Sequence, residues 1–224
     1  MYLRSERIVS PQGIIKAILN IEDGKIIDII NYHARVMIDI DVADNLVISD
    51  ISNAKVDINK ATNVDNYLLN IDESQCDLMS FCQFLKTNES YFLADCNKLS
   101  KEVLKLIINE KKDSAMHLVN SCEIYDSYTL VNSIKYFTQQ LDVSLSDSLK
   151  MCCENVCAML NINDYGSIQI DKAADLLVID EKYNISLKIE KGKILWFLTK
   201  WERNSLQRPH FVFFVWKMCY FMLI

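Results

Sequence analysis

The chain has 224 residues, which is enough for one domain with a hydrophobic core or for two small domains. Half of the residues are apolar, which excludes an intrinsically disordered chain. The formal net charge of −6 at pH 7 argues against nucleic acid as a main partner. No basic segment followed by an apolar run begins the sequence, so we expect a cytoplasmic protein whose eight cysteines are reduced.

Both ends of the chain predict β-hairpins. Ile14–Ile21 and Ile26–Ile30 are apolar-rich runs separated by a turn that contains Gly24. Ile185–Ile189 and the residues after Gly192 repeat this strand–turn–strand pattern. The two hairpins could be unrelated, but their matching pattern favours one shared sheet in which each glycine lies in a hairpin turn.

The middle of the chain predicts helices with short strands between them. Helical spacing of apolar residues marks helices over 74–84, 100–109, 125–137 and 145–160, and a short strand is expected over 91–94. Ser144, with Asp147 three residues later, is a variant of the capping box that begins helices. Asn161 suits the end of that helix, because asparagine tolerates the left-handed conformation found there.

After this helix the pattern changes to β-type runs. Ser167–Ile170 and Leu176–Ile179 predict two short strands, separated by the polar residues 171–175.

Three neighbouring cysteines, Cys152, Cys153 and Cys157, raise the question of a metal cluster. Adjacent cysteines lack the C-x-x-C spacing of such sites, and no partner pair occurs elsewhere in the sequence. We therefore predict that these cysteines are small apolar side chains on the buried face of a helix.

Three segments around this helix resemble a known family. They are Glu154–Cys157, Tyr165–Ile168 and Asp171–Val178. Their order and spacing are similar to the C-terminal segment of the N-acetylglucosamine-6-phosphate deacetylases of the amidohydrolase superfamily. The first segment lacks the proline and alanine of the family motif, and Asp171 stands where the family has glycine.

The resemblance implies an α+β fold. Its parts would be a small β-sandwich formed by residues 1–47 and 166–195, and an incomplete, mostly helical remnant of a TIM-type (β/α) barrel over 48–165. Residues 46–58 would stand at the end of the first barrel strand, and residues 196–224 lie outside the match. The interval 48–143 is less than half of the about 200 residues that a complete barrel needs.

The resemblance also implies where metal ligands would stand. In the family a divalent metal such as zinc activates water, and an aspartate passes the proton to the leaving amine. Lys55 and Asp57 occupy the positions of two ligand histidines, and Val119 occupies that of a ligand glutamate. A protonated lysine has no lone pair to offer a metal. His33, His117 and His210 match no ligand motif, and we expect His117 to be a packing residue.

The sequence therefore predicts a truncated and degenerate relative of these deacetylases. We expect no catalytic residue, no metal ligand and no cofactor in this chain, and the substrate-binding residues are unknown. The family that the chain resembles hydrolyses an amide in amino-sugar catabolism, whereas this chain is expected to be inactive. An alternative is a non-catalytic interaction module that pairs with an intact deacetylase paralogue or with itself.

A further alternative is peripheral membrane contact through residues 200–224. Residues 211–224 are apolar apart from Lys217, but they are fewer than the ~20 that span a bilayer. Lys200, Arg203 and Arg208 precede them, a pattern compatible with attachment at a membrane surface. A strand that covers the core, or a tail translated from non-homologous sequence, explains the same composition.

Overall fold

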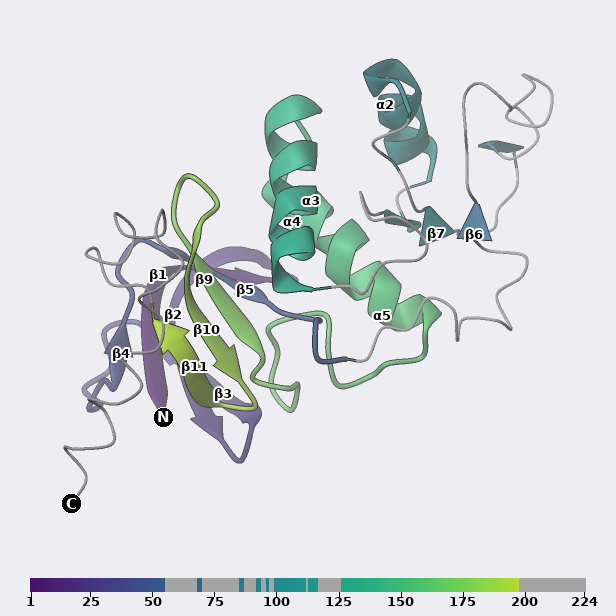
Figure 1. Ribbon diagram of the computed structural model, residues 1–224. Helices are drawn as coiled ribbons and strands as arrows, with labels where there is room; N and C mark the ends of the chain where they lie inside the picture. Colours follow the sequence, from purple (N-terminus) through teal and green to yellow (C-terminus); the bar gives the residue numbers. More distant parts are fainter. Residues whose placement is uncertain are drawn as a thin grey trace, which may run out of the picture.

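The strands of the larger sheet lie on one side of the molecule, and the helices lie on the other side together with the short strands β6 and β7 (Figure 1). The computed structural model describes residues 1–54, 68–69, 85–86, 92–93, 96, 99–111, 113–116 and 126–197. The larger sheet comprises β1 (Tyr2–Ser10), β2 (Gly13–Glu22), β3 (Lys25–Asn31), β4 (Ile40–Asp41), β5 (Leu46–Ser49), β9 (Leu176–Ile179), β10 (Ile185–Glu190) and β11 (Lys193–Phe197). The helical side comprises α2 (Lys101–Glu110), α3 (Ser127–Gln140), α4 (Leu145–Leu149), the π-helical turn η3 (Lys150–Glu154) and α5 (Asn155–Met159).

The two ends of the chain share one mixed sheet, as the matching hairpins predicted. Seven strands follow the order β11-β10-β9-β5-β1-β2-β3, and β4 pairs with β1. At the centre, β5 runs parallel to β1 and antiparallel to β9. Gly24 and Gly192 both have a positive φ, in the turns between β2 and β3 and between β10 and β11.

This sheet folds over on itself, so the strands of the predicted small β-sandwich form one continuous sheet of eight strands. Lys25, at the start of β3, forms an isolated bridge with Ala173, just before β9. The Ile26 N–H donates to the Lys172 carbonyl across 2.9 Å. Register shifts within the β1–β2, β2–β3 and β10–β11 pairs mark bulges, which bend strands and increase their twist. One sheet can thereby enclose its own core.

The central strands β5 and β9 are buried on both faces. Val47 and Val178 belong to the core enclosed by the sheet. Ile48 and Leu177 belong to a second core, which the sheet shares with the helices. A strand buried on both sides needs no polar alternation, which explains the continuous apolar sequences of these two strands.

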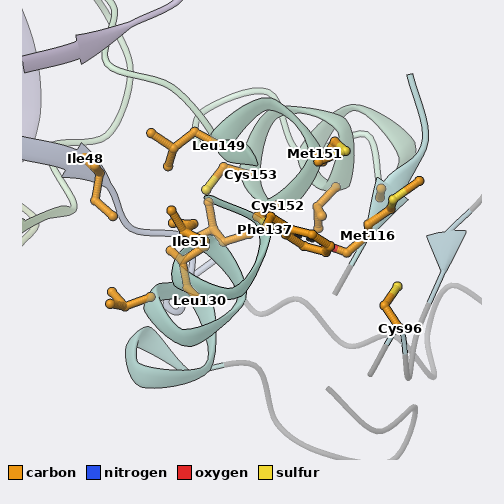
Figure 2. Packing of buried hydrophobic residues seen from close by; sticks show 14 of the residues in the cluster. Ile48, Ile51, Cys96, Met116, Leu130, Phe137, Leu149, Met151, Cys152 and Cys153 are labelled. Atoms are coloured by element: carbon orange, nitrogen blue, oxygen red, sulfur yellow. Dashed lines mark hydrogen bonds between the residues drawn. The ribbon is translucent and has the colours of Figure 1, made fainter. Parts of the chain in front are cut away.

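Helix α3 and the segment from α4 to α5 form the other side of the second core (Figure 2). Phe137 and Leu130 of α3 are fully buried with Ile51, which follows β5. Cys152 and Met116 approach the same group of side chains, and the Cys152 thiol donates to the Met116 carbonyl across 3.4 Å.

The predicted helix over 145–160 is present but interrupted. Ser144 caps it as expected, because its Oγ accepts from the Asp147 N–H at 3.0 Å. The five residues of η3 then form a wider turn between α4 and α5. Met151, Cys152 and Cys153 within η3 are all buried. A regular helix with 3.6 residues per turn does not place three successive side chains on one face, so the sequence period does not predict this burial. Asn161 ends the helix with φ of 55°, as predicted.

The prediction of a strand over Ser167–Ile170 is wrong. This segment has no strand structure and lies between Gly166 and Asp171, whose φ values of 99° and 69° turn the chain. Ile168 is buried in the sheet core, whereas Ile170 is half-exposed. The segment thus covers the core as a loop, and the following prediction, Leu176–Ile179, coincides with β9.

Three two-residue strands form a separate parallel sheet in the order β6 (Leu68–Leu69), β7 (Phe92–Leu93) and β8 (Ala115–Met116). β7 lies within the predicted strand 91–94, and α2 agrees with the predicted helix 100–109. The predicted helix 74–84 lies outside the described residues. Strand β5, expected near the end of a first barrel strand, pairs in the mixed sheet instead. Within the described ranges, no helix has both the length and the apolar character needed to cross a membrane.

Candidate functional site

A buried polar network joins the end of β5 to β10 and to the start of α3. Asp50 follows β5 directly and is wholly buried. Its Oδ2 accepts from the Ser127 Oγ at 2.8 Å and from the Ser52 Oγ at 2.9 Å. Its Oδ1 accepts from the Ser52 N–H at 3.0 Å, and the Lys188 Nζ lies 3.1 Å from Oδ2.

Lys188 completes this network from β10. Besides pairing with Asp50, its ammonium donates to the Ser127 Oγ at 2.8 Å and to the Ser52 Oγ at 3.0 Å. These contacts use the three donors of the ammonium, and the carboxylate of Asp50 also has donors on both oxygens. Both charged groups are thus held by partners within the network, whose geometry is that of a structural clamp.

A second buried carboxylate, that of Asp175, directly precedes β9 and also connects separate parts of the fold. Its Oδ2 accepts from the Asn53 side-chain amide at 2.9 Å, and its Oδ1 accepts from the Lys191 N–H at 2.6 Å. The Asp175 carbonyl accepts from the Asp50 N–H at 2.8 Å, which ties the two networks together. Asp175 thus fixes the residues after β5 and the turn between β10 and β11.

The residues that carry the family resemblance have structural roles of the same kind. The Asn155 side-chain amide donates to the Ser114 carbonyl across 2.9 Å and ties α5 to the residue before β8. Gly166 lies so close to α5 that a Cβ there would come within 3.1 Å of the Cys157 Sγ. Asp175, in the third resembling segment, connects the start of β9 with the turn between β10 and β11. Each of the three segments thus contributes one residue at a contact between two elements. The resembling segments therefore support the fold, and they do not by themselves indicate a catalytic activity.

The cysteines of η3 and α5 confirm the packing prediction. Cys152 and Cys153 are wholly buried, and Cys157 is nearly so. Burial raises the pKa of the Cys152 and Cys153 thiols well above their ordinary value. Burial likewise raises the pKa of Cys157 to about 12. These thiols stay protonated at neutral pH, so they are poor nucleophiles and poor metal ligands.

Most of the positions discussed above as metal ligands, and two of the three histidines, lie outside the residues that the structure describes. Lys55, Asp57, His117, Val119 and His210 lie outside those residues, and so does the tail 200–224. His33 is exposed and makes an edge contact with the Tyr32 ring at a centroid distance of 5.2 Å. Among the described residues, no group of three or more His, Cys, Asp or Glu side chains is placed to hold a metal ion.

The sequence-based reasoning missed the network of Asp50, Ser127 and Lys188. One signal was available, because Asp50 is an acidic residue inside the apolar run from Leu46 to Ile51. A carboxylate in such a run is buried, and a buried charge needs a partner. Nothing local identifies Lys188 as that partner, since 137 positions separate the two residues.

No protein-family model matches the sequence, and no curated protein matches it either. Solved structures do match in fold. The N-acetylglucosamine-6-phosphate deacetylase from Thermotoga maritima has a TM-score of 0.57 at 13% identity, over 88% of this chain and 100% of that chain. The N-acetyl-D-glucosamine-6-phosphate deacetylase from Mycobacterium smegmatis has a TM-score of 0.60 at 9% identity, with the same coverage of both chains.

The likeness extends beyond the deacetylases. An enamidase described as a member of the amidohydrolase superfamily has a TM-score of 0.51 at 11% identity, over 89% of this chain and 96% of that chain. At such identities a structural match carries information about the fold alone. The chain therefore has a mixed α/β fold with a large mixed sheet, similar to that of amidohydrolase-superfamily structures.

Proposed function

We propose that this chain is a catalytically inactive, shortened relative of the N-acetylglucosamine-6-phosphate deacetylases. The observation that carries the proposal is a deacetylase-like fold combined with the residues Lys55, Asp57 and Val119 at the implied ligand positions. In this proposal the three short parallel strands β6, β7 and β8 are what remains of the barrel. The domain boundaries expected from the sequence, 1–47 with 166–195 and 48–165, belong to the same proposal.

The chemistry of the donor groups supports this view. Metal-assisted amide hydrolysis needs at least three protein ligands and an open position for water. The two wholly buried carboxylates of the described residues, Asp50 and Asp175, already accept hydrogen bonds on both oxygens. The buried thiols are held in the protonated form by their raised pKa values. In this proposal, neither these carboxylates nor these thiols serve as ligands of a catalytic zinc ion.

Metal content tests this proposal directly. The full chain would be purified after growth with added zinc and dialysed, and its bound metal measured by mass spectrometry. We expect well under one metal ion per chain. One zinc ion per chain that is lost in Asp57→Asn and retained in the exposed control Asp44→Asn would overturn the proposal.

The proposed role without catalysis is that of an interaction module. Retention of both buried cores, in a chain that lacks the implied ligands, supports selection for the folded scaffold. An intact deacetylase paralogue and a second copy of this chain remain the two predicted partners. Co-purification of the tagged chain with a full-length deacetylase would support the first partner, and an unpartnered monomer by light scattering would contradict both.

A further inference from the structure

We propose that η3 and the first turn of α5 close the shortened barrel by covering the edge of β8 on which a further strand would pair. Because the proposed function treats β6, β7 and β8 as what remains of a barrel, the inference rests on it. Within the described residues β8 ends this small sheet, and β7 lies along one of its edges. A strand edge that nothing covers presents N–H and C=O groups that pair with other chains.

Two carbonyls at β8 accept hydrogen bonds from this helical segment. The carbonyl of Ser114, directly before β8, accepts from the Asn155 side-chain amide at 2.9 Å. The Met116 carbonyl accepts from the Cys152 thiol at 3.4 Å (Figure 2). Successive carbonyls of a strand point to opposite edges, so those of Ser114 and Met116 point to the same edge. That edge faces η3 and α5, and β7 occupies the other one.

The covered edge is also shielded from water. Ser114, Ala115 and Met116 are buried, and so are the two residues that contact them, Cys152 and Asn155. A buried carbonyl needs a donor, and a neighbouring strand would supply it from its backbone N–H groups. Here the two side chains supply the donors, so the helical segment takes the place of one more strand.

The wide turn η3 also contacts the large sheet. Cys153 follows Cys152 in the chain, and its thiol donates to the carbonyl of Ser49, the last residue of β5, across 3.9 Å. One segment thus contacts a strand of each sheet. A strand added beside β8 would have to displace η3 and α5. The partner of the proposed interaction module is therefore expected to bind at another surface.

Removal of both donors tests the inference. In the full-length variant Asn155→Ala/Cys152→Ala, two copies should pair along the uncovered edges of β8. We expect the weight-average mass from light scattering to rise with concentration to about twice that of the wild type. Amide exchange of residues 114–116, measured by mass spectrometry, should become slower as the mass rises. Cys152→Ser keeps a donor and should retain the wild-type mass.

The matched control is Ser144→Ala, which weakens the same helical segment at its cap without a change at β8. It should retain the wild-type mass as well. Circular dichroism verifies that each variant is folded, and Asn155→Ala alone replaces the double variant, with the same expectations, if the double variant is unfolded.

Three results would overturn the inference. The first is a folded variant without the donors that keeps the wild-type mass at all concentrations. The second is equal association of Ser144→Ala, which would indicate lost stability as the cause. The third is association with faster exchange at 114–116, which would place the contact elsewhere. Metal content and acetate release play no part in these readouts, so failure here is distinct from failure of the proposed loss of catalysis.

Discussion

The ammonium of Lys188 lies 3.1 Å from the carboxylate of Asp50, and their side chains are only 14% and 0% exposed. The pair connects β10 with the residue after β5, and Ser127 adds the start of α3. A buried pair of this kind need not stabilise the fold more than apolar side chains would. Loss of one partner alone, however, leaves the other charge buried and unpaired, which destabilises the folded state.

Lys188→Met should therefore lower the free energy of unfolding by about 3 kcal/mol, because Asp50 loses its counter-charge. Urea denaturation measures this change. The control is Lys16→Met, which breaks an exposed pair with Glu6 and should change the free energy of unfolding much less. Equal losses in the two variants would show that burial of the Asp50 pair has no energetic consequence.

The contact between the two hairpin turns gives a second prediction. Gly192 has φ of 72°, and a Cβ added there would come within 2.9 Å of the Ile21 Cγ2. Gly192→Ala should cost about 2 kcal/mol through backbone strain and this collision. In the Ile21→Ala background the collision is removed, so the same substitution should cost measurably less. Additive losses in the double variant would contradict the packing of Gly192 against Ile21.

The cap of the helix that begins at α4 gives a third prediction. Ser144→Ala removes the oxygen that accepts from the Asp147 N–H, and it should cost about 1 kcal/mol of unfolding free energy. Ser146→Ala changes an exposed serine two residues later, within α4, and serves as the control. A loss in Ser144→Ala no larger than in this control would mean that the cap contributes nothing.

The buried thiols make stability dependent on pH in the alkaline range. The pKa of Cys157 is raised by burial from its ordinary value of 9.0 to about 12. An unfolded thiol loses its proton near pH 9, whereas the folded one keeps it. The stabilisation is therefore complete below about pH 9 and declines as the pH rises towards 12.

Urea denaturation at pH 8, 9 and 10 measures this decline. We expect a shallower decline in Cys157→Ala than in the wild type, since one of the titrating thiols is removed. Thiol labelling of the folded protein at pH 8, mapped by mass spectrometry, should leave Cys152, Cys153 and Cys157 unmodified. Rapid labelling of these three cysteines, or identical pH profiles for the two proteins, would contradict their burial.

Local sequence patterns predicted the elements whose conformation depends mainly on their own residues. Turn glycines identified the hairpins, and the apolar run 176–179 identified β9. The segment 167–170 has similar local composition, but the positive φ values on either side of it make it a loop. The π-helical turn η3 also escaped prediction, because it depends on which side chains the neighbouring elements bury.

The buried polar networks depend even more than these elements on contacts between residues that are far apart in the sequence. The Asp50–Lys188 pair and the hydrogen bond between Asn53 and Asp175 each join residues from distant parts of the chain. No spacing rule connects such residues before the sheet is folded. The resemblance to a family supplied the expected fold and the implied ligand positions, whereas the contacts that hold Asn155, Gly166 and Asp175 required the structure.

The proposed function requires that a deacetylase-like fold be kept without deacetylase activity. Its most direct test is the release of acetate from N-acetylglucosamine 6-phosphate by the purified full chain, with zinc supplied in excess. We predict no release above that of a boiled sample of the same preparation. Zinc-dependent turnover that Asp57→Asn abolishes would contradict the account and assign that residue to an active metal site.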